Sequence, residues 1–150
     1  MSSSLRVART EAKGLKPLVE DAAALHGRLQ ALIRRHLPGV TASLLAEPRP
    51  LSEGQAQDWY TDLAGQPVPL GSLSAAEQTA ARKLLQDRLD SLLKLANELP
   101  KVAPQSADLA GPLRSAIQYP GDDHVYLVGG QPVLTFWGHL PPGAAKAFTR

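Results

Sequence analysis

The stretch HVYLVGGQPVLTFWGH, residues 124 to 139, decides how the later part of the chain folds. Val128 and Gln131 flank Gly129-Gly130, a pair that accepts positive φ and therefore favours a tight two-residue turn. This turn predicts a β-hairpin with a fixed register. The expected pairs are Leu127 with Pro132, Tyr126 with Val133, Val125 with Leu134, and His124 with Thr135.

Side chains on such a hairpin alternate between two faces. The face expected to join the core collects Val125, Leu127, Leu134 and Phe136. The other face is mixed, and we expect it to meet a helix, solvent or a partner; it collects His124, Tyr126, Thr135 and Trp137. Pro132 lacks an N–H at a position where that group would point away from the paired strand, so it predicts an outer edge.

An earlier stretch, DWYTDLAGQPVPLGSL (58–73), repeats the phrase GQPV. By the same reasoning it predicts a second hairpin, with Ala64-Gly65 as the turn and Pro67 equivalent to Pro132. We interpret both GQPV phrases as a tight turn that needs glycine, followed by a proline at a position that an edge strand tolerates. Four matching residues leave open whether the chain contains an internal duplication.

Apolar residues recur at helical spacing in two long segments. They predict helices over 15–37, with Pro17 in the first turn, and over 74–99, where Ser74 and Glu77 form a capping box and Pro100 ends the helix. A strand is predicted over 40–47 and a short helix over 106–117.

These elements predict an α+β fold in which two long helices cover one face of a small, mainly antiparallel sheet built from two hairpins. We expect residues 1–14 to be a flexible terminus, residues 15–139 to form a single domain, and residues 140–150 to be a loose tail.

Composition narrows the classes of function. The chain has 150 residues, of which 43% are hydrophobic, and it contains no cysteine, which excludes disulfides and cysteine nucleophiles. It has no signal-peptide core and no apolar run of about 18 residues, so we expect a cytoplasmic protein without a membrane span. Residues 1–36 carry seven Lys/Arg against three Asp/Glu, a balance of +4 that is too diffuse to predict nucleic-acid binding.

Motifs for catalysis are sparse. The four histidines lack metal-ligand spacing, and the phosphate-binding and nucleophile-elbow motifs are absent, so the sequence predicts no cofactor. The best local cluster of polar groups is Asp122, Asp123 and His124. It keeps a hydrolase-type enzyme as one alternative, although its context is typical of a polar turn.

The phrases WYT (59–61), GQPVPL (65–70), VYLV (125–128) and QPVLTFWG (131–138) together resemble the N-terminal region of bacterial SrfA-family proteins. The resemblance covers roughly residues 40 to 139. It implies an N-terminal cytoplasmic module of a virulence- or envelope-associated protein, upstream of a membrane segment that this chain lacks. It assigns no functional residues, because no known chemistry is attached to these phrases.

The leading hypothesis is a non-enzymatic scaffold or protein-interaction module of a larger bacterial assembly. It would bind a protein partner through the mixed hairpin face or by strand addition at an open edge. The candidate interaction residues are Tyr60, Tyr126, Pro132 and Trp137. A homodimer joined through edge strands is the second alternative.

Overall fold

The computed structural model describes residues 5–11, 16–17, 21–50, 56–119, 121 and 124–140. These residues form an α+β fold, which confirms the predicted class. In chain order the elements are β1 (Leu5–Glu11), β2 (Lys16–Pro17), α1 (Ala22–His36), α2 (Gly39–Ala42), β3 (Glu47–Pro50), β4 (Ala56–Thr61), β5 (Val68–Pro69), the 3-10 turn η1 (Leu70–Ser72), α3 (Ala75–Val102), the 3-10 segment η2 (Pro104–Leu109), α4 (Ala110–Ala116), β6 (Val125–Val128), β7 (Gln131–Leu134) and β8 (His139–Leu140).

The strands named above are divided among separate antiparallel sheets. Three strands form a sheet in the order β1-β4-β3, three more form a sheet in the order β5-β6-β7, and β2 pairs with β8. The β6–β7 hairpin has the predicted register, with Val128 opposite Gln131 and Leu127 opposite Pro132. Both residues of its turn, Gly129 and Gly130, have positive φ, so the turn chemistry read from the sequence is confirmed.

The hairpin predicted around Ala64-Gly65 is wrong. After β4 the chain turns at Thr61, whose hydroxyl accepts a hydrogen bond from the Leu63 amide at 3.1 Å, and it crosses to the other sheet. There β5 pairs with β6, whereas β4 pairs with β1 and β3. The second hairpin of the fold is therefore β3–β4. A local turn signal could not reveal this exchange, because both alternative partners of β4 lie earlier in the chain.

The two GQPV phrases lie on opposite sides of β6. Leu127 of β6 faces Val68 in β5 on one side and Pro132 in β7 on the other. Their turns also meet, because a Cβ atom placed on Gly65 would lie 2.8 Å from the amide nitrogen of Gly129. Glycine is required at this contact, where the two backbones approach too closely for a side chain.

The first long helix begins later than predicted. Asp21 caps α1, accepting from the Ala24 amide at 3.2 Å, while Lys16–Pro17 lie in β2 and not in a first helical turn. The strand predicted over 40–47 is also wrong over most of its length. Pro38 precedes the short helix α2, and extended pairing begins only at Glu47. Here the helical turn after a proline outweighs the β-branched and apolar character of the run.

The second long helix opens on the predicted capping box. The Ser74 hydroxyl accepts from the Glu77 amide at 3.2 Å, and the Glu77 carboxylate accepts from the Ser74 amide at 3.0 Å. Pro100 lies inside α3 and does not end it, since the helix continues to Val102. The predicted short helix is present as η2 followed by α4.

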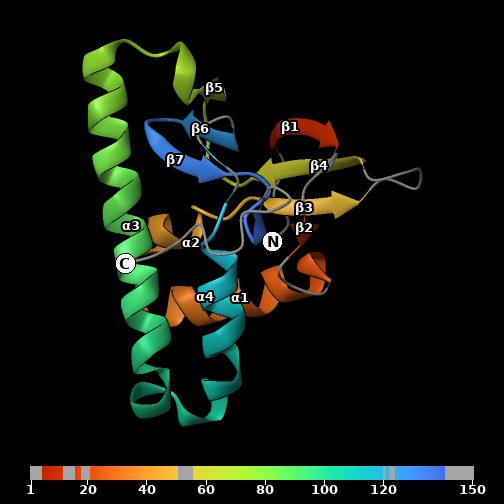
Figure 1. Cartoon of the computed structure of the whole chain (residues 1–150), viewed down its shortest axis with the longest axis vertical. Helices are drawn as coiled ribbons and strands as arrows, with labels where there is room; N and C mark the ends of the chain where they lie inside the picture. Colours follow the sequence, from red (N-terminus) through yellow and green to blue (C-terminus); the bar gives the residue numbers. More distant parts are fainter. Residues whose placement is uncertain are drawn as a thin grey trace.

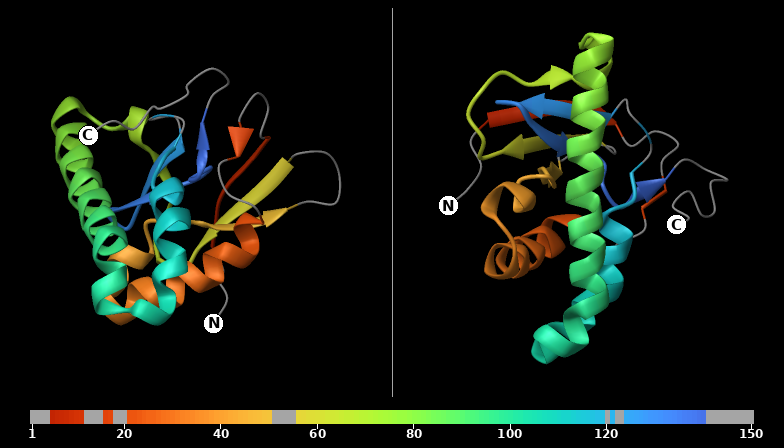
Figure 2. Two further views of the ribbon diagram at one scale, coloured as in Figure 1. Left: turned by 60° about the horizontal axis from the view of Figure 1, so that its bottom comes forward. Right: turned by 90° about the vertical axis from the view of Figure 1, so that its left-hand side faces the viewer.

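Figure 1 shows α3 running along one side of the molecule, with the β5-β6-β7 sheet beside its first half and α4 beside its second half. The β1-β4-β3 sheet lies on the side of the β5-β6-β7 sheet away from α3 (Figures 1 and 2). The helix α1 contacts β3, whereas α3 contacts β7. Each long helix thus packs on a different sheet, in contrast to the single covered face expected from the sequence.

The ends of the expected domain also differ. Residues Leu5–Glu11 form β1, so the predicted flexible terminus is wrong for this part of 1–14. At the other end, Leu140 belongs to β8, and the predicted tail over 141–150 lies outside the described residues.

Candidate functional site

Trp137 does not project as an interaction residue. Its side chain is 0% exposed, and its indole Nε1–H donates to the Ala46 carbonyl oxygen at 2.7 Å. The expected mixed face ends early because β7 stops at Leu134 and the chain turns through Phe136, whose φ is +51°. Trp137 is therefore a core residue, and this correction removes it from the candidate surface.

The other three candidate residues lie on three different strands. Tyr60 is half-buried in β4, with the Arg49 guanidinium carbon 3.8 Å from its ring centroid, a cation–π contact. Tyr126 is half-buried in β6. Pro132 lies on β7, the outer strand of its sheet, but it is buried in the region where α3 packs on this strand. The structure does not bring these residues into one site.

The polar cluster proposed around Asp122, Asp123 and His124 is described only at His124. Its ring packs edge-to-face on Phe136, with centroids 5.4 Å apart. Asp122 and Asp123 lie outside the described residues. Within the described ranges, no three His, Asp or Glu side chains gather as metal ligands would.

Two further histidines pack around the same aromatic residues. The His26 ring lies 6.1 Å from Trp137 and its Nε2 is 3.1 Å from the Leu45 carbonyl oxygen, while His139 Nδ1 is 3.0 Å from the Trp137 carbonyl oxygen. Burial lowers the pKa of His26 and the pKa of His139, because it disfavours the charged imidazolium. His139 is buried and His26 is half-buried, and in both burial favours the neutral form of the ring.

The surface feature with binding character is an open groove between the first half of α3 and the β5-β6-β7 sheet. We call it the α3 groove. Its volume is about 390 Å³. Gly129 and Gly130 of the β6–β7 turn form part of its wall, and its apolar side chains are Val68, Leu73, Ala80, Ala81, Leu84 and Leu127. It lies at the end of the molecule where α3 begins (Figure 1).

The groove is a continuation of the core that the described residues leave uncovered. Ala81 is buried, Leu84 and Leu127 are half-buried, and Ala80 is exposed. Small side chains on α3 face larger aliphatic ones on β5 and β6, which leaves room for side chains supplied from outside. A mostly apolar concave surface with few polar groups is typical of a binding site.

Two polar side chains line the groove. The first is Gln66, the glutamine of the first GQPV phrase, and the second is Glu77. Gln131, the glutamine of the second GQPV phrase, instead accepts a hydrogen bond of 2.5 Å from Arg88 on α3. Among the described residues of the lining, Glu77 alone is charged. Its Oε1 belongs to the capping box, and no hydrogen bond from the described part of the chain reaches its Oε2.

Prolines occupy the edges of two outer strands, β3 and β5. In β3, Pro48 and Pro50 occupy alternate positions of an outer strand, and β5, another outer strand, carries Pro69 with Pro67 two residues earlier. Two prolines that lie two residues apart remove N–H groups from the same side of a strand. The edges of β3 and β5 are therefore poor templates for an added strand.

The α3 groove was not predicted from the sequence. One signal did point toward it: Leu84 lies beside the main apolar stripe of its helix, next to the small pair Ala80-Ala81. A stripe wider than one neighbour can cover indicates a second apolar contact. Which element would lie opposite depended on the β5–β6 pairing, which the sequence did not predict.

Comparison of the chain with protein-family models, with curated proteins and with solved structures finds no match. The resemblance to the SrfA family stays an expectation. No helix in the described ranges combines the length and the apolar character that a membrane span requires.

Proposed function

We propose that this protein is a non-enzymatic interaction module that binds an apolar segment of a protein partner in the α3 groove. The observation that supports this proposal is the open, mostly apolar groove that the described residues form between α3 and the β5-β6-β7 sheet. Burying one aliphatic side chain there contributes about 1.5–3 kcal/mol, so two anchors supply a substantial part of a micromolar affinity.

The groove is a better candidate than the proline-containing edges of β3 and β5. Strand addition needs free N–H donors, and prolines remove them from alternate positions of β3 and β5. Insertion of side chains into the groove needs no backbone donors from the protein. The resemblance noted from the sequence adds a bacterial assembly as the proposed setting.

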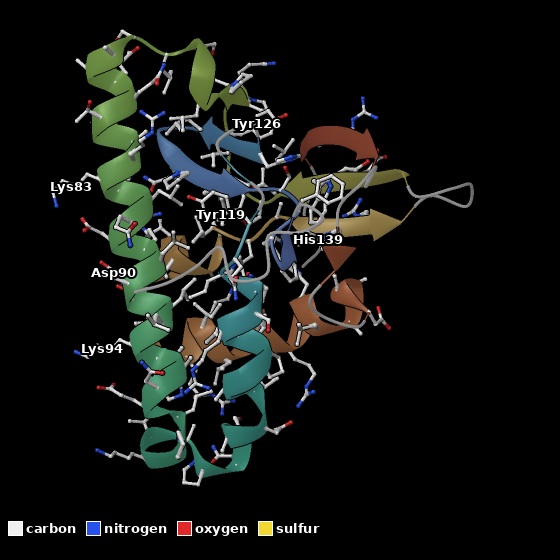
Figure 3. All side chains as sticks on the ribbon, in the orientation of Figure 1. Lys83, Asp90, Lys94, Tyr119, Tyr126 and His139 are labelled. Atoms are coloured by element: carbon white, nitrogen blue, oxygen red, sulfur yellow. The ribbon has the colours of Figure 1, made fainter. Side chains whose placement is uncertain are left out.

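The test places a photo-reactive benzoyl-phenylalanine at Ala80, which is exposed at the groove, and separately at Lys94, which points outward from α3 (Figure 3). Cross-linking is carried out in the native host, and adducts are identified by mass spectrometry. We expect a discrete protein adduct from position 80 and none of the same mass from position 94.

The matched substitution is Ala80→Glu, with Ala31→Glu as its control at an exposed position of α1. We expect Ala80→Glu to weaken binding of the identified partner at least about tenfold, because it places a carboxylate among aliphatic side chains. Isothermal titration calorimetry measures both variants. Equal affinities for the two variants would exclude the groove as the binding site.

A further inference from the structure

The charge of the α3 groove restricts what can occupy it. Glu77 contributes a carboxylate to the lining, and none of the described residues that line the groove is a Lys or Arg. A partner that brings an acidic group close to this carboxylate would be repelled, whereas a basic group would find a free acceptor at Oε2. Electrostatic complementarity of this kind selects among partners more than it raises affinity.

We infer that the occupant is a helical segment presenting two aliphatic side chains four residues apart, with a lysine or arginine within one turn of them. This inference rests on the proposed function and specifies the partner of the same site. It assigns Ala80, Ala81, Leu84 and Leu127 to the aliphatic anchors and Glu77 to the basic side chain.

The dimensions of the groove agree with two anchors. Along α3 its lining runs from Glu77 to Leu84, and the seven steps between these two residues span about 10 Å at a rise of 1.5 Å per residue. Side chains at positions i and i+4 of a helix have Cβ atoms about 5–6 Å apart, so a pair of them fits within this length. A volume of about 390 Å³ accommodates side chains and not a whole backbone segment.

A helical occupant also follows from the edge strand beside the groove. Because β5 carries Pro69, with Pro67 just before it, an extended peptide would lack donors at these positions if it lay along this strand. A helix satisfies its own backbone hydrogen bonds and requires only side-chain contacts.

Glu77 offers a clean substitution. Glutamine can take the place of glutamate in a capping box, so Glu77→Gln keeps the contact with the Ser74 amide while it removes the negative charge. A change in charge preference can then be separated from a change in helix stability. Circular dichroism melting should give similar midpoints for the wild-type protein and this variant.

The experiment selects a phage-displayed library of random 12-residue peptides on the wild-type protein, on Glu77→Gln and on Ala80→Glu. We expect the wild type to enrich aliphatic pairs at i and i+4 with a nearby Lys or Arg. Glu77→Gln should enrich the same aliphatic pairs without the basic preference, and Ala80→Glu should fail to enrich the aliphatic pairs. For the wild-type consensus peptide, fluorescence polarisation should show a loss of affinity of roughly two- to fivefold with Glu77→Gln.

The outcomes separate the two proposals. Aliphatic pairs enriched with no basic preference on the wild type, or an unchanged affinity for Glu77→Gln, would overturn the charge inference and leave the groove as a binding site. The same peptides enriched on Ala80→Glu, or no peptides enriched on the wild type, would overturn both the inference and the proposed function.

Discussion

At the scale of single residues, the two tryptophans are the clearest contrast in the molecule. Trp59 and Trp137 are both fully buried, and their rings meet with centroids 6.3 Å apart. The Trp137 indole N–H has a partner in the Ala46 carbonyl oxygen, whereas the Trp59 N–H has none among the described residues. A buried donor without a partner carries a desolvation penalty, so equal burial does not mean an equal contribution to stability.

The matched substitutions are Trp137→Phe and Trp59→Phe, which remove similar volumes. We expect Trp137→Phe to lower the free energy of unfolding by roughly 1–3 kcal/mol more than Trp59→Phe, because it leaves the Ala46 carbonyl oxygen without its donor. Urea unfolding followed by far-ultraviolet circular dichroism measures the difference. Equal losses would show that this hydrogen bond adds no net stability.

At the scale of elements, the fold depends on how two similar turns meet beside one strand. The β6–β7 hairpin could be predicted because its turn and both its strands lie within ten residues. The pairing of β5 with β6 could not, since it joins Val68 to Leu127 across the whole of α3. The repeated GQPV was visible in the sequence, but the two copies of this segment adopt different local structures.

The contact between the turns can be tested with Gly129→Ala, using Gly130→Ala as its control. Both positions have positive φ, so both substitutions carry similar backbone strain. A Cβ atom at Gly129 would lie 2.6 Å from the Ala64 carbonyl oxygen, whereas one at Gly130 meets open space.

We therefore expect Gly129→Ala to cost about 1–3 kcal/mol more than Gly130→Ala, seen as a lower midpoint in thermal unfolding. If the two variants melt together, the close approach of the turns is not a constraint on the fold.

At the scale of the whole molecule, histidines from different elements converge on the aromatic core. His26 comes from α1, His124 precedes β6, and His139 comes from β8. The charged groups near His26 are Glu47, Asp62 and Arg34. The two carboxylates raise the pKa of His26, but burial lowers it by more, so the pKa is lowered overall. The sequence showed four scattered histidines, and their convergence required the tertiary structure.

Stability should depend on pH through His26 and His139. Their pKa values are lower in the folded state than in the unfolded chain, so the unfolded state binds more protons below about pH 6.5. The free energy of unfolding should be highest above this pH and should fall as the pH drops toward 5, by at most about 1.4 kcal/mol per pH unit for each histidine.

The measurement is urea unfolding between pH 5 and 7, repeated with His26→Gln and His139→Asn together. We expect the double variant to show a flatter dependence on pH over this range. An unchanged slope would mean that the protonation of other groups dominates.

The pairing of β2 with β8 joins residues 16–17 to residues 139–140. During synthesis on the ribosome, this contact cannot form until almost the whole sequence described here has emerged, and Phe136 and Trp137 reach Trp59 at the same late stage. Contacts of such long sequence separation slow folding. The nascent polypeptide therefore has an extended period in which its apolar segments lack their final neighbours, and we expect it to engage chaperones during translation.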